Sequence, residues 1–245
     1  MHRFFVSPGA LSEGELILRE AQAHQVHGVL RLHPGEIIVA LDNTGREYRV
    51  ELVQVSRALV RGRIVETLTE SREARTELTL YQGLLKADKF EWILQKGTEL
   101  GVAAFVPLVT ERVIASDVSR NKRARWERIL VEAAEQSGRT RIPRLADATL
   151  FAVALKQAQA GGGCALIPWE GERAADLRTA LCPQGSVHLF IGPEGGLSAG
   201  EIEQARSHAV QPITLGPRIL RAETAGLVAA SAILFARGEM DAAER

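Results

Sequence analysis

The sequence of 245 residues lacks any long uncharged segment. Its longest stretch without Asp, Glu, Lys or Arg runs from Thr179 to Pro193, which is too short to cross a bilayer and is interrupted by Pro, Gln and Gly. The apolar run before the Ser-Pro-Gly segment consists only of Phe4, Phe5 and Val6, so the hydrophobic region of a secretory signal is missing. We therefore expect no transmembrane helix and no membrane partner, and we expect a cytoplasmic protein.

Cysteine is also scarce. Cys164 and Cys182 stand in no CxxC or metal-type spacing, so we expect them to pack as small hydrophobic side chains rather than to form a bridge, which suits a reducing compartment. His24 and His27 are three residues apart on a predicted helix, but no further His, Cys or carboxylate has matching spacing. We therefore expect no metal site.

An excess of positive charge is missing as well, because 30 basic residues balance 30 acidic ones. This balance disfavours nucleic-acid binding through bulk charge. Only five of the basic residues are lysines, and the rest are arginines, whose planar guanidinium groups suit phosphate oxygens and base edges. Between Arg112 and Arg144, nine basic residues accompany four acidic ones. Charge alone leaves two interpretations open for this segment, a solvated helix face or a contact with RNA.

The pattern of hydrophobic residues divides the chain into two domains. Residues 1–70 show short, partly alternating strands and one helix, typical of a small β-barrel, and Asp42-Asn43-Thr44-Gly45 predicts a hairpin. Residues 71–76 are polar and suit a linker. From residue 77 to 245, continuous apolar strands alternate with amphipathic helices, which predicts an α/β domain with helices on both faces of a parallel sheet.

Two glycine-proline loops stand at predicted strand ends of this second domain. The first is GPEGGLS at residues 192–198, where Ser198 and Glu201 have the spacing of a capping box that begins a helix, and the second is LGPRILRAETA at residues 215–225. Ligands of open α/β sheets bind beyond the carboxyl ends of strands, where backbone amides and helix N-termini converge. Either loop alone could be a tight turn, with Arg221 and Glu223 as a surface ion pair. Together the two loops predict a pocket, whereas phosphate-loop, nucleophile-elbow and HExxH motifs are absent.

Five segments together resemble the signature of the SPOUT methyltransferases of RsmE type. They are RFFV at 3–6, KADKFEWILQKGTELGV at 86–102, EAAEQSGR with the following IP at 132–143, and the two glycine loops. This family methylates N3 of a uridine in small-subunit (16S) ribosomal RNA. The resemblance implies an N-terminal PUA-like barrel that binds RNA, a C-terminal SPOUT domain with a deep trefoil knot, bound S-adenosylmethionine and a homodimer. The substrate would be 16S ribosomal RNA, free or within the small ribosomal subunit.

The resemblance also implies roles for individual residues. Those expected to bind the cofactor are Leu166, Pro168, Gly192, Glu194, Gly195, Gly196, Leu215, Gly216, Ile219, Leu220 and Ala225. Those expected to bind RNA are Arg3, Arg120, Lys122, Arg123 and Arg125. Methylation of N3 requires a base that removes the imide proton and a cation that stabilises the uracil carbonyl oxygens. Glu223 or Glu135 could be the base and Arg221 or Arg139 the cation, and the sequence does not choose among them.

Two other functions remain in view. One is a different SPOUT reaction, such as ribose 2′-O-methylation. The other is a non-catalytic RNA-binding factor of ribosome assembly, against which the intact GPEGG and RAET segments count. The final predicted helix, residues 222–237, is apolar on nearly every side and should be buried on all of them. Either the N-terminal barrel or a second copy of the chain could cover it, and the resemblance implies a SPOUT dimer. We therefore predict a dimer whose pocket uses both chains, with Ala230 and Leu234 of the final helix at the interface.

Overall fold

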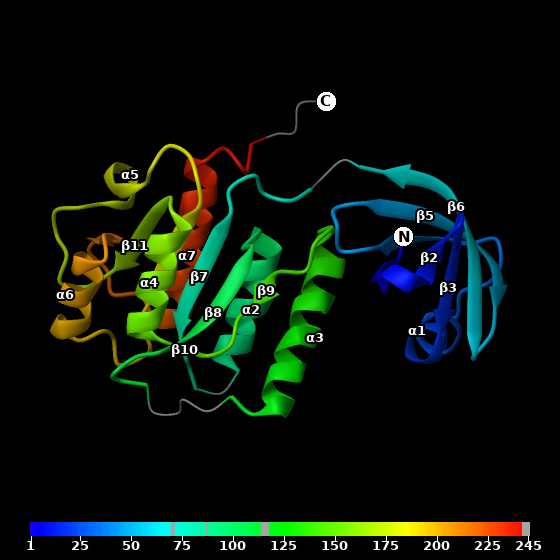
Figure 1. Ribbon diagram of the computed structural model, residues 1–245, viewed down its shortest axis with the longest axis horizontal. Helices are drawn as coiled ribbons and strands as arrows, with labels where there is room; N and C mark the ends of the chain where they lie inside the picture. The colour runs from blue at the N-terminus through cyan, green and yellow to red at the C-terminus, as the bar shows by residue number, and fades with distance from the viewer. Residues whose placement is uncertain (70–71, 87, 114–117, 242–245) are drawn as a thin grey trace. The chain divides into compact units, whose positions relative to one another are not determined.

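The computed structural model describes residues 1–69, 72–86, 88–113 and 118–241. The chain divides into two compact units, which Figure 1 draws with their elements labelled. The N-terminal unit comprises Met1–Glu73 together with Ala134–Ile142, and the C-terminal unit comprises Ala74–Ala133 and Pro143–Arg245. Among the helices of the described ranges, none combines the length and the apolar character that crossing a membrane requires.

The N-terminal unit is built on a curled six-stranded sheet (Figure 1). In sheet order, its strands are β1 (Arg3–Phe5), β4 (Ile37–Leu41), β5 (Glu47–Val55), β6 (Leu59–Leu68), β3 (Glu15–Arg19) and β2 (Leu11–Ser12). All neighbours are antiparallel except β1 and β4. The register between β5 and β6 shifts twice, and such irregularities bend strands and increase their twist, so the sheet can curl around its own core.

Alternation along these strands fills the core of the N-terminal unit. Leu16 and Leu18 of β3 are buried, whereas the strand's terminal residues are exposed. Helix α1 (Glu20–His24) and the π-helical turn Gln25–Val29 cover the core with Ala23 and Val26. A Cβ on Gly62 would lie 2.3 Å from Val50 Cγ1, so only glycine lets β6 approach β5 this closely. The prediction of a β-rich N-terminal domain is confirmed.

A segment from the middle of the chain, Ala134–Ile142, also belongs to the N-terminal unit. The Phe5 backbone N–H donates to Glu135 Oε1 at 2.9 Å, and the Ile142 N–H donates to Asn43 Oδ1 at 2.7 Å. The sequence analysis placed this segment in the C-terminal domain. The structure differs because these side-chain to backbone bonds join residues about a hundred positions apart, which local periodicity does not reveal.

The C-terminal unit contains a seven-stranded parallel sheet. Six strands follow the order β10 (Thr149–Leu150), β8 (Ala104–Val109), β7 (Leu78–Gly83), β12 (Val187–Ile191), β11 (Cys164–Pro168) and β13 (Val210–Ile213), and β9 (Arg144–Leu145) also pairs with β8. The central strands β7 and β12 are buried along their whole length. Such continuous apolar strands require cover on both faces of the sheet. The prediction of an α/β domain is confirmed.

Helices lie on both faces of this sheet (Figure 1). Helices α4 (Phe151–Gly161) and α6 (Ala199–Ser207) pack with Tyr81, Leu108 and Phe190 in one core. Helices α2 (Lys89–Leu100) and α7 (Ala222–Ala236) pack against each other, and α7 also packs on β7 and β12. Helix α3 (Arg120–Ser137) begins in the C-terminal unit and ends in the N-terminal one, and α5 (Leu177–Ala180) is a single turn.

Helix α7 corrects the expectation for the last helix. Ala230 and Leu234 are fully buried within the chain itself, together with Ile233, so they are core residues rather than interface residues. The opposite side of the helix is exposed, with 44% of Val228 and 69% of Phe235 accessible. The hydrophobic pattern of the sequence could not distinguish the buried side of this helix from its exposed side, because small and apolar residues occupy both.

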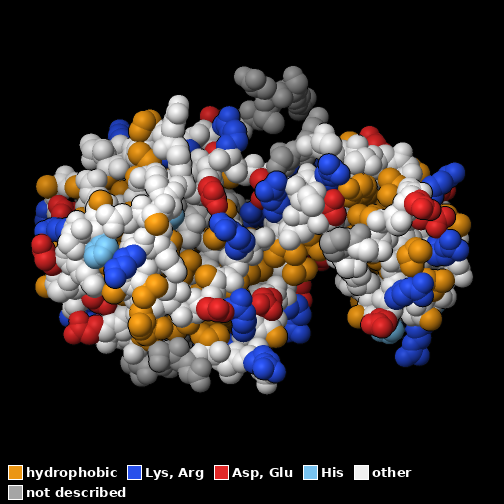
Figure 2. Space-filling model, viewed as in Figure 1, with side chains coloured by type: hydrophobic (Ala, Val, Ile, Leu, Met, Phe, Trp, Pro, Cys, Tyr) orange, Lys and Arg blue, Asp and Glu red, His pale blue; other side chains and the backbone are white. Residues whose placement is uncertain are grey.

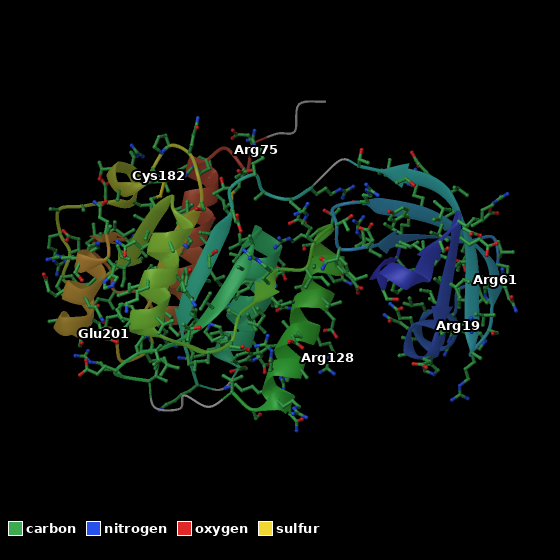
Figure 3. The ribbon with its side chains drawn as sticks, in the orientation of Figure 1. Arg19, Arg61, Arg75, Arg128, Cys182 and Glu201 are labelled. Atoms are coloured by element: carbon green, nitrogen blue, oxygen red, sulfur yellow. A yellow bond between two sulfur atoms is a disulfide. The ribbon has the colours of Figure 1, made fainter. Side chains whose placement is uncertain are left out.

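The two cysteines correct a second expectation. Cys164, at the start of β11, and Cys182, which follows α5 (Figure 3), form a disulfide with their Cα atoms 5.8 Å apart. The Cys182 N–H also donates to Cys164 Sγ at 3.3 Å. The chain leaves β11, forms α5 and returns to the beginning of the strand. This return path depends on the tertiary fold, so the spacing of the two cysteines did not predict it.

Candidate functional site

Two loops at the carboxyl ends of β12 and β13, on either side of β11, line a cavity of about 510 Å³ in the C-terminal unit. Its lining residues are Lys89, Pro168, Trp169, Glu170, residues 191–197, residues 219–223 and Ala225. A cavity of about 290 Å³, lined by residues 214–220 and Arg173, shares Pro168, Trp169 and Glu170 with the first. A cavity of this size, beyond the carboxyl ends of parallel strands, is the usual ligand site of an α/β sheet.

The structure brings nearly all the predicted cofactor residues to these cavities. The larger cavity includes Pro168, Gly192, Glu194, Gly195, Gly196, Ile219, Leu220 and Ala225, and the smaller one adds Leu215 and Gly216. Leu166 is fully buried within β11, and at the end of this strand Pro168 and Trp169 are the residues that reach the cavity. Sequence reasoning did not identify Trp169, since the surrounding LIPWEG segment matched no motif closely.

Glycine is required at specific points of the loop after β12. A Cβ on Gly83, at the end of the neighbouring β7, would lie 2.5 Å from Pro193 N. A Cβ on Gly192 would lie 2.9 Å from Leu197 Cγ. Gly196 has a φ of +70°, a conformation that side-chain-bearing residues rarely adopt. The close approach of the loop to the end of the sheet therefore requires glycine at positions 83 and 192, whereas at position 196 glycine relieves backbone strain.

The loop ends in a helix cap that the sequence predicted correctly. Ser198 Oγ accepts a hydrogen bond from the Glu201 N–H at 3.2 Å, and the Ser198 N–H donates to Glu201 Oε2 at 2.9 Å. Glu201 lies at the start of α6 (Figure 3), and its Oε1 also accepts from the Glu111 N–H at 2.8 Å. This reciprocal capping fixes the direction in which the chain leaves the loop.

A cluster of charged side chains lies at one side of the cavity. Lys89 Nζ is 3.5 Å from Glu194 Oε1 and 3.4 Å from Glu223 Oε1. Glu223 lies in the first turn of α7, where the helix dipole stabilises a negative charge. Its side chain is 16% exposed, and its Oε2 is buried without a hydrogen-bond partner among the described residues. Arg221, at the N-cap of the same helix, is exposed.

Sequence reasoning missed Lys89. The only signal was its position inside the KADKFEWILQKGTELGV block, which contributed to the resemblance without a residue being singled out.

Comparison with known proteins places this site in a family. A family model described as an RNA methyltransferase domain matches residues 72–234, which include both glycine loops. The chain belongs to this RNA methyltransferase family. Two curated relatives are named ribosomal RNA small subunit methyltransferase E. The Bacillus subtilis protein is 37% identical over 223 residues, which are 87% of each chain, and the Synechocystis protein is 36% identical over 95% of this chain and 77% of its own.

A solved structure of a methyltransferase E is similar in fold as well as in sequence. The Neisseria gonorrhoeae enzyme, crystallised bound to S-adenosyl methionine, is 33% identical and covers 96% of this chain and 97% of its own, with a TM-score of 0.87. The predicted resemblance to RsmE-type methyltransferases is confirmed.

Two of the candidate catalytic residues of this methyltransferase lie in the N-terminal unit. Glu135 accepts the Phe5 N–H, and the buried Arg139 pairs with Glu73. Burial raises the pKa of Glu73, but hydrogen bonds from Arg139 and from the Thr140 N–H outweigh burial and leave this pKa below its ordinary value. Both candidates thus have structural roles within the N-terminal unit. Glu223 and Arg221 are the candidates that line the methyltransferase cavity.

Two of the predicted RNA-binding residues are engaged inside their own units. Arg3 pairs with the buried Glu47 at 2.7 Å, and its own side chain is 15% exposed. Arg123 pairs with Asp147 at 2.7 Å and donates to the Leu145 carbonyl at 2.9 Å. These contacts fix neighbouring segments of the methyltransferase and occupy the guanidinium groups.

The other basic residues of α3 are more accessible. Arg120 is exposed, Arg125 pairs with Glu91 at 2.6 Å, and Lys122 Nζ lies 5.1 Å from the ring centroid of Trp126. Trp126 is 1% exposed, so it packs inward and does not stack on a base. On the face seen in Figure 2, Lys and Arg side chains are interspersed with Asp and Glu. Any RNA contact of the methyltransferase through α3 therefore depends on a few exposed cations rather than on a continuous basic surface.

Proposed function

We propose that this chain uses S-adenosylmethionine to methylate N3 of a uridine in 16S ribosomal RNA, free or within the small ribosomal subunit. One observation carries the proposal. Both glycine loops of the RsmE-type signature line a single cavity, and the carboxylate residue Glu223 lines it with them. A ribosomal RNA substrate would place the enzyme in the cytoplasm. The N-terminal unit is the proposed RNA-binding, PUA-like domain.

The residues of the cavity fit S-adenosylmethionine. Trp169, Leu197, Ile219 and Leu220 provide apolar walls, and the backbone of residues 192–196 can approach a ligand closely because glycine occupies three of these positions. Three glutamates line the cavity against one lysine and one arginine, an acidic balance that suits a cationic ligand. When bound, S-adenosylmethionine supplies a methyl group on a sulfonium, and the electron pair of the breaking S–C bond stays on sulfur.

In this proposal, Glu223 is the base. Its carboxylate accepts the proton of the uracil N3–H, which leaves the N3 electron pair free to form the new N–C bond. Arg221, two residues earlier and exposed at the mouth of the cavity, stabilises negative charge on the uracil carbonyl oxygens. Glu135 is the weaker candidate because it belongs to the N-terminal unit, where it accepts the Phe5 N–H, and is not among the residues that line the cavity.

The proposed reaction can be tested by its product. The purified protein is incubated with 16S ribosomal RNA or small subunits and S-adenosylmethionine, and the digested nucleosides are separated by mass spectrometry. We expect 3-methyluridine, and Glu223→Gln should reduce its formation at least about 100-fold, the lower range of general base catalysis. Glu203→Gln, on the exposed side of α6, is the matched control. Formation of 2′-O-methyluridine, or of no product, would contradict the proposal.

We also propose that the enzyme is a homodimer. The exposed side chains of Val228 and Phe235 on α7, and of Trp92 on the adjacent α2, place three large apolar groups on neighbouring helices. Large apolar side chains grouped on one exposed surface mark interaction sites. The RsmE-type resemblance implies that a second copy of the chain covers them.

A further inference from the structure

Lys89, the first residue of α2, lines the cavity from outside both glycine loops. The segment from the end of β7 to the start of α2 precedes both loops by about a hundred residues. Gln82, the next-to-last residue of β7, is fully buried and donates from Nε2 to the Gly192 carbonyl at 3.5 Å. The Lys86 N–H donates to Glu194 Oε1 at 3.2 Å. This segment is therefore attached to the first loop by two hydrogen bonds.

Lys89 extends the attachment to the second loop. It is the first residue of α2, and its ammonium group lies between a carboxylate of the first loop, Glu194, and the carboxylate of Glu223 on α7. Both contacts involve the Oε1 atom of the glutamate. The second oxygen of Glu223, Oε2, is buried and has no hydrogen-bond partner among the residues that the structure describes. The lysine thus restrains the Glu223 carboxylate at the edge of the cavity.

Stability alone gives little reason for this arrangement. The lysine and Glu194 side chains are each 34% exposed, and ion pairs at such partly exposed positions contribute at most about 1 kcal/mol. Orientation is a stronger reason, because a displacement of about 1 Å in a reacting group can reduce a rate about 100-fold. A carboxylate that rotates freely about its side-chain torsions would have the reactive orientation for only part of the time.

We propose that Lys89 is a positioning residue for the methyl transfer: its ammonium group, 3.4 Å from Glu223 Oε1, holds this carboxylate in the orientation in which it accepts the uracil N3–H proton. This inference rests on the proposed function, in which Glu223 is the base. It assigns to the start of α2 a role in the reaction that differs from cofactor binding by the two glycine loops.

The experiment compares three lysine variants in the full chain. Lys89→Met keeps the length of the side chain but removes its charge, and we expect kcat for 3-methyluridine formation to fall about 100-fold. Lys89→Arg retains donors for both carboxylates and should recover at least about a tenth of the wild-type kcat. Lys156→Met, on the exposed side of α4, is the matched control and should behave as wild type. The affinity for S-adenosylmethionine, measured by calorimetry, should change less than about threefold in all three.

A double variant separates positioning from an independent role. If the lysine acts through Glu223, the combination of Lys89→Met with Glu223→Gln should be no slower than Glu223→Gln alone. Multiplied losses would overturn the inference, because they would show a separate interaction with RNA or cofactor. A loss of cofactor affinity that matches the loss of kcat would overturn it as well, since the lysine would then act through Glu194.

The remaining outcomes are equally decisive. Full activity of Lys89→Met in an active wild-type background contradicts this inference and leaves the proposed function intact. Absence of 3-methyluridine with the wild-type protein contradicts the proposed function itself. If Lys89→Met does not fold, as judged by circular dichroism, Lys89→Gln replaces it in the single and in the double variant, with the same expected loss of kcat and the same lack of additivity with Glu223→Gln.

Discussion

Replacement of Gly196 by valine tests whether the first glycine loop binds the methyl donor. Gly196 has a φ of +70°, and a residue with a side chain in this left-handed region costs about 1–2 kcal/mol. A Cβ at this position would lie 3.5 Å from Glu170 Oε1, which is ordinary contact, so the variant should still fold. The valine methyl groups would extend beyond Cβ near Glu170, which lines the same cavity. We therefore expect a modest loss of stability and a larger loss of ligand space.

Two measurements follow from this geometry. The free energy of unfolding in urea should fall by about 1–2 kcal/mol. The affinity for S-adenosylmethionine, measured by calorimetry, should fall at least about tenfold, which corresponds to about 1.4 kcal/mol. Gly200→Ala is the matched control, because this glycine lies in α6 and has room for a side chain. A Cβ added to it would lie 3.7 Å from Ser198 Oγ. A folded Gly196→Val variant with unchanged affinity would refute the assignment of this loop to the cofactor.

The neighbouring Gly195 is a poorer test, although the sequence suggested both positions. A Cβ on Gly195 would lie 3.2 Å from Arg112 Cβ, and Arg112 also donates to the Gly195 carbonyl at 2.8 Å. A substitution there would displace Arg112 before it affected the cavity. Loss of binding in a Gly195 variant would therefore have two explanations.

Two further predictions concern the dimer and the RNA. Phe235→Asp should shift the mass in analytical ultracentrifugation from dimer to monomer and reduce methylation. The control Val53→Asp, at an exposed position of the N-terminal sheet, should leave the mass unchanged. A dimeric Phe235→Asp variant would contradict the proposed interface. Replacing Arg120 and Lys122 together by glutamine should weaken RNA binding and leave the cofactor affinity unchanged. The slope of the logarithm of the RNA association constant against the logarithm of the salt concentration should fall in magnitude by about 0.7–0.9 for each phosphate that the variant no longer neutralises. An unchanged slope would identify α3 as a solvated face.

Most helices and strands could be predicted from the sequence because their patterns are local. The continuous apolar run of Leu78–Gly83 and the alternation around Leu16 and Leu18 correspond to a buried parallel strand and to a strand with one buried face. The capping box of Ser198 and Glu201 placed the start of α6. The two-residue strands β9 and β10 were missed, since so few residues show neither alternation nor a run.

Features that depend on contacts between distant segments could not be read in this way. The Cys164–Cys182 bridge, the transfer of Ala134–Ile142 to the N-terminal unit and the position of Lys89 between two glutamates all join residues from separate elements. Hydrophobic periodicity does not reveal a trefoil knot, and protein chains generally avoid threading through loops. The knot therefore stays a prediction that follows from the resemblance alone. For the cavity itself, the loop motifs were sufficient, because glycine loops after neighbouring parallel strands converge at one edge of a sheet.

Cavity volume alone would favour the opposite edge of this sheet. A cavity of about 640 Å³ lies at the amino ends of β7, β8 and β12, with Tyr81 and His188 among its lining residues. Burial lowers the pKa of His188 and raises that of Tyr81, so both side chains are neutral near pH 7. Their polar atoms are already engaged, since the Tyr81 hydroxyl lies 3.3 Å from His188 Nδ1 and His188 Nε2 lies 3.1 Å from the Gly162 carbonyl oxygen. At the carboxyl edge, by contrast, Glu223 lies in the first turn of a helix, where the helix dipole stabilises negative charge, and it lines a cavity together with Arg221 and both glycine loops. The cavity of about 510 Å³ at this edge is therefore the better candidate for the active site.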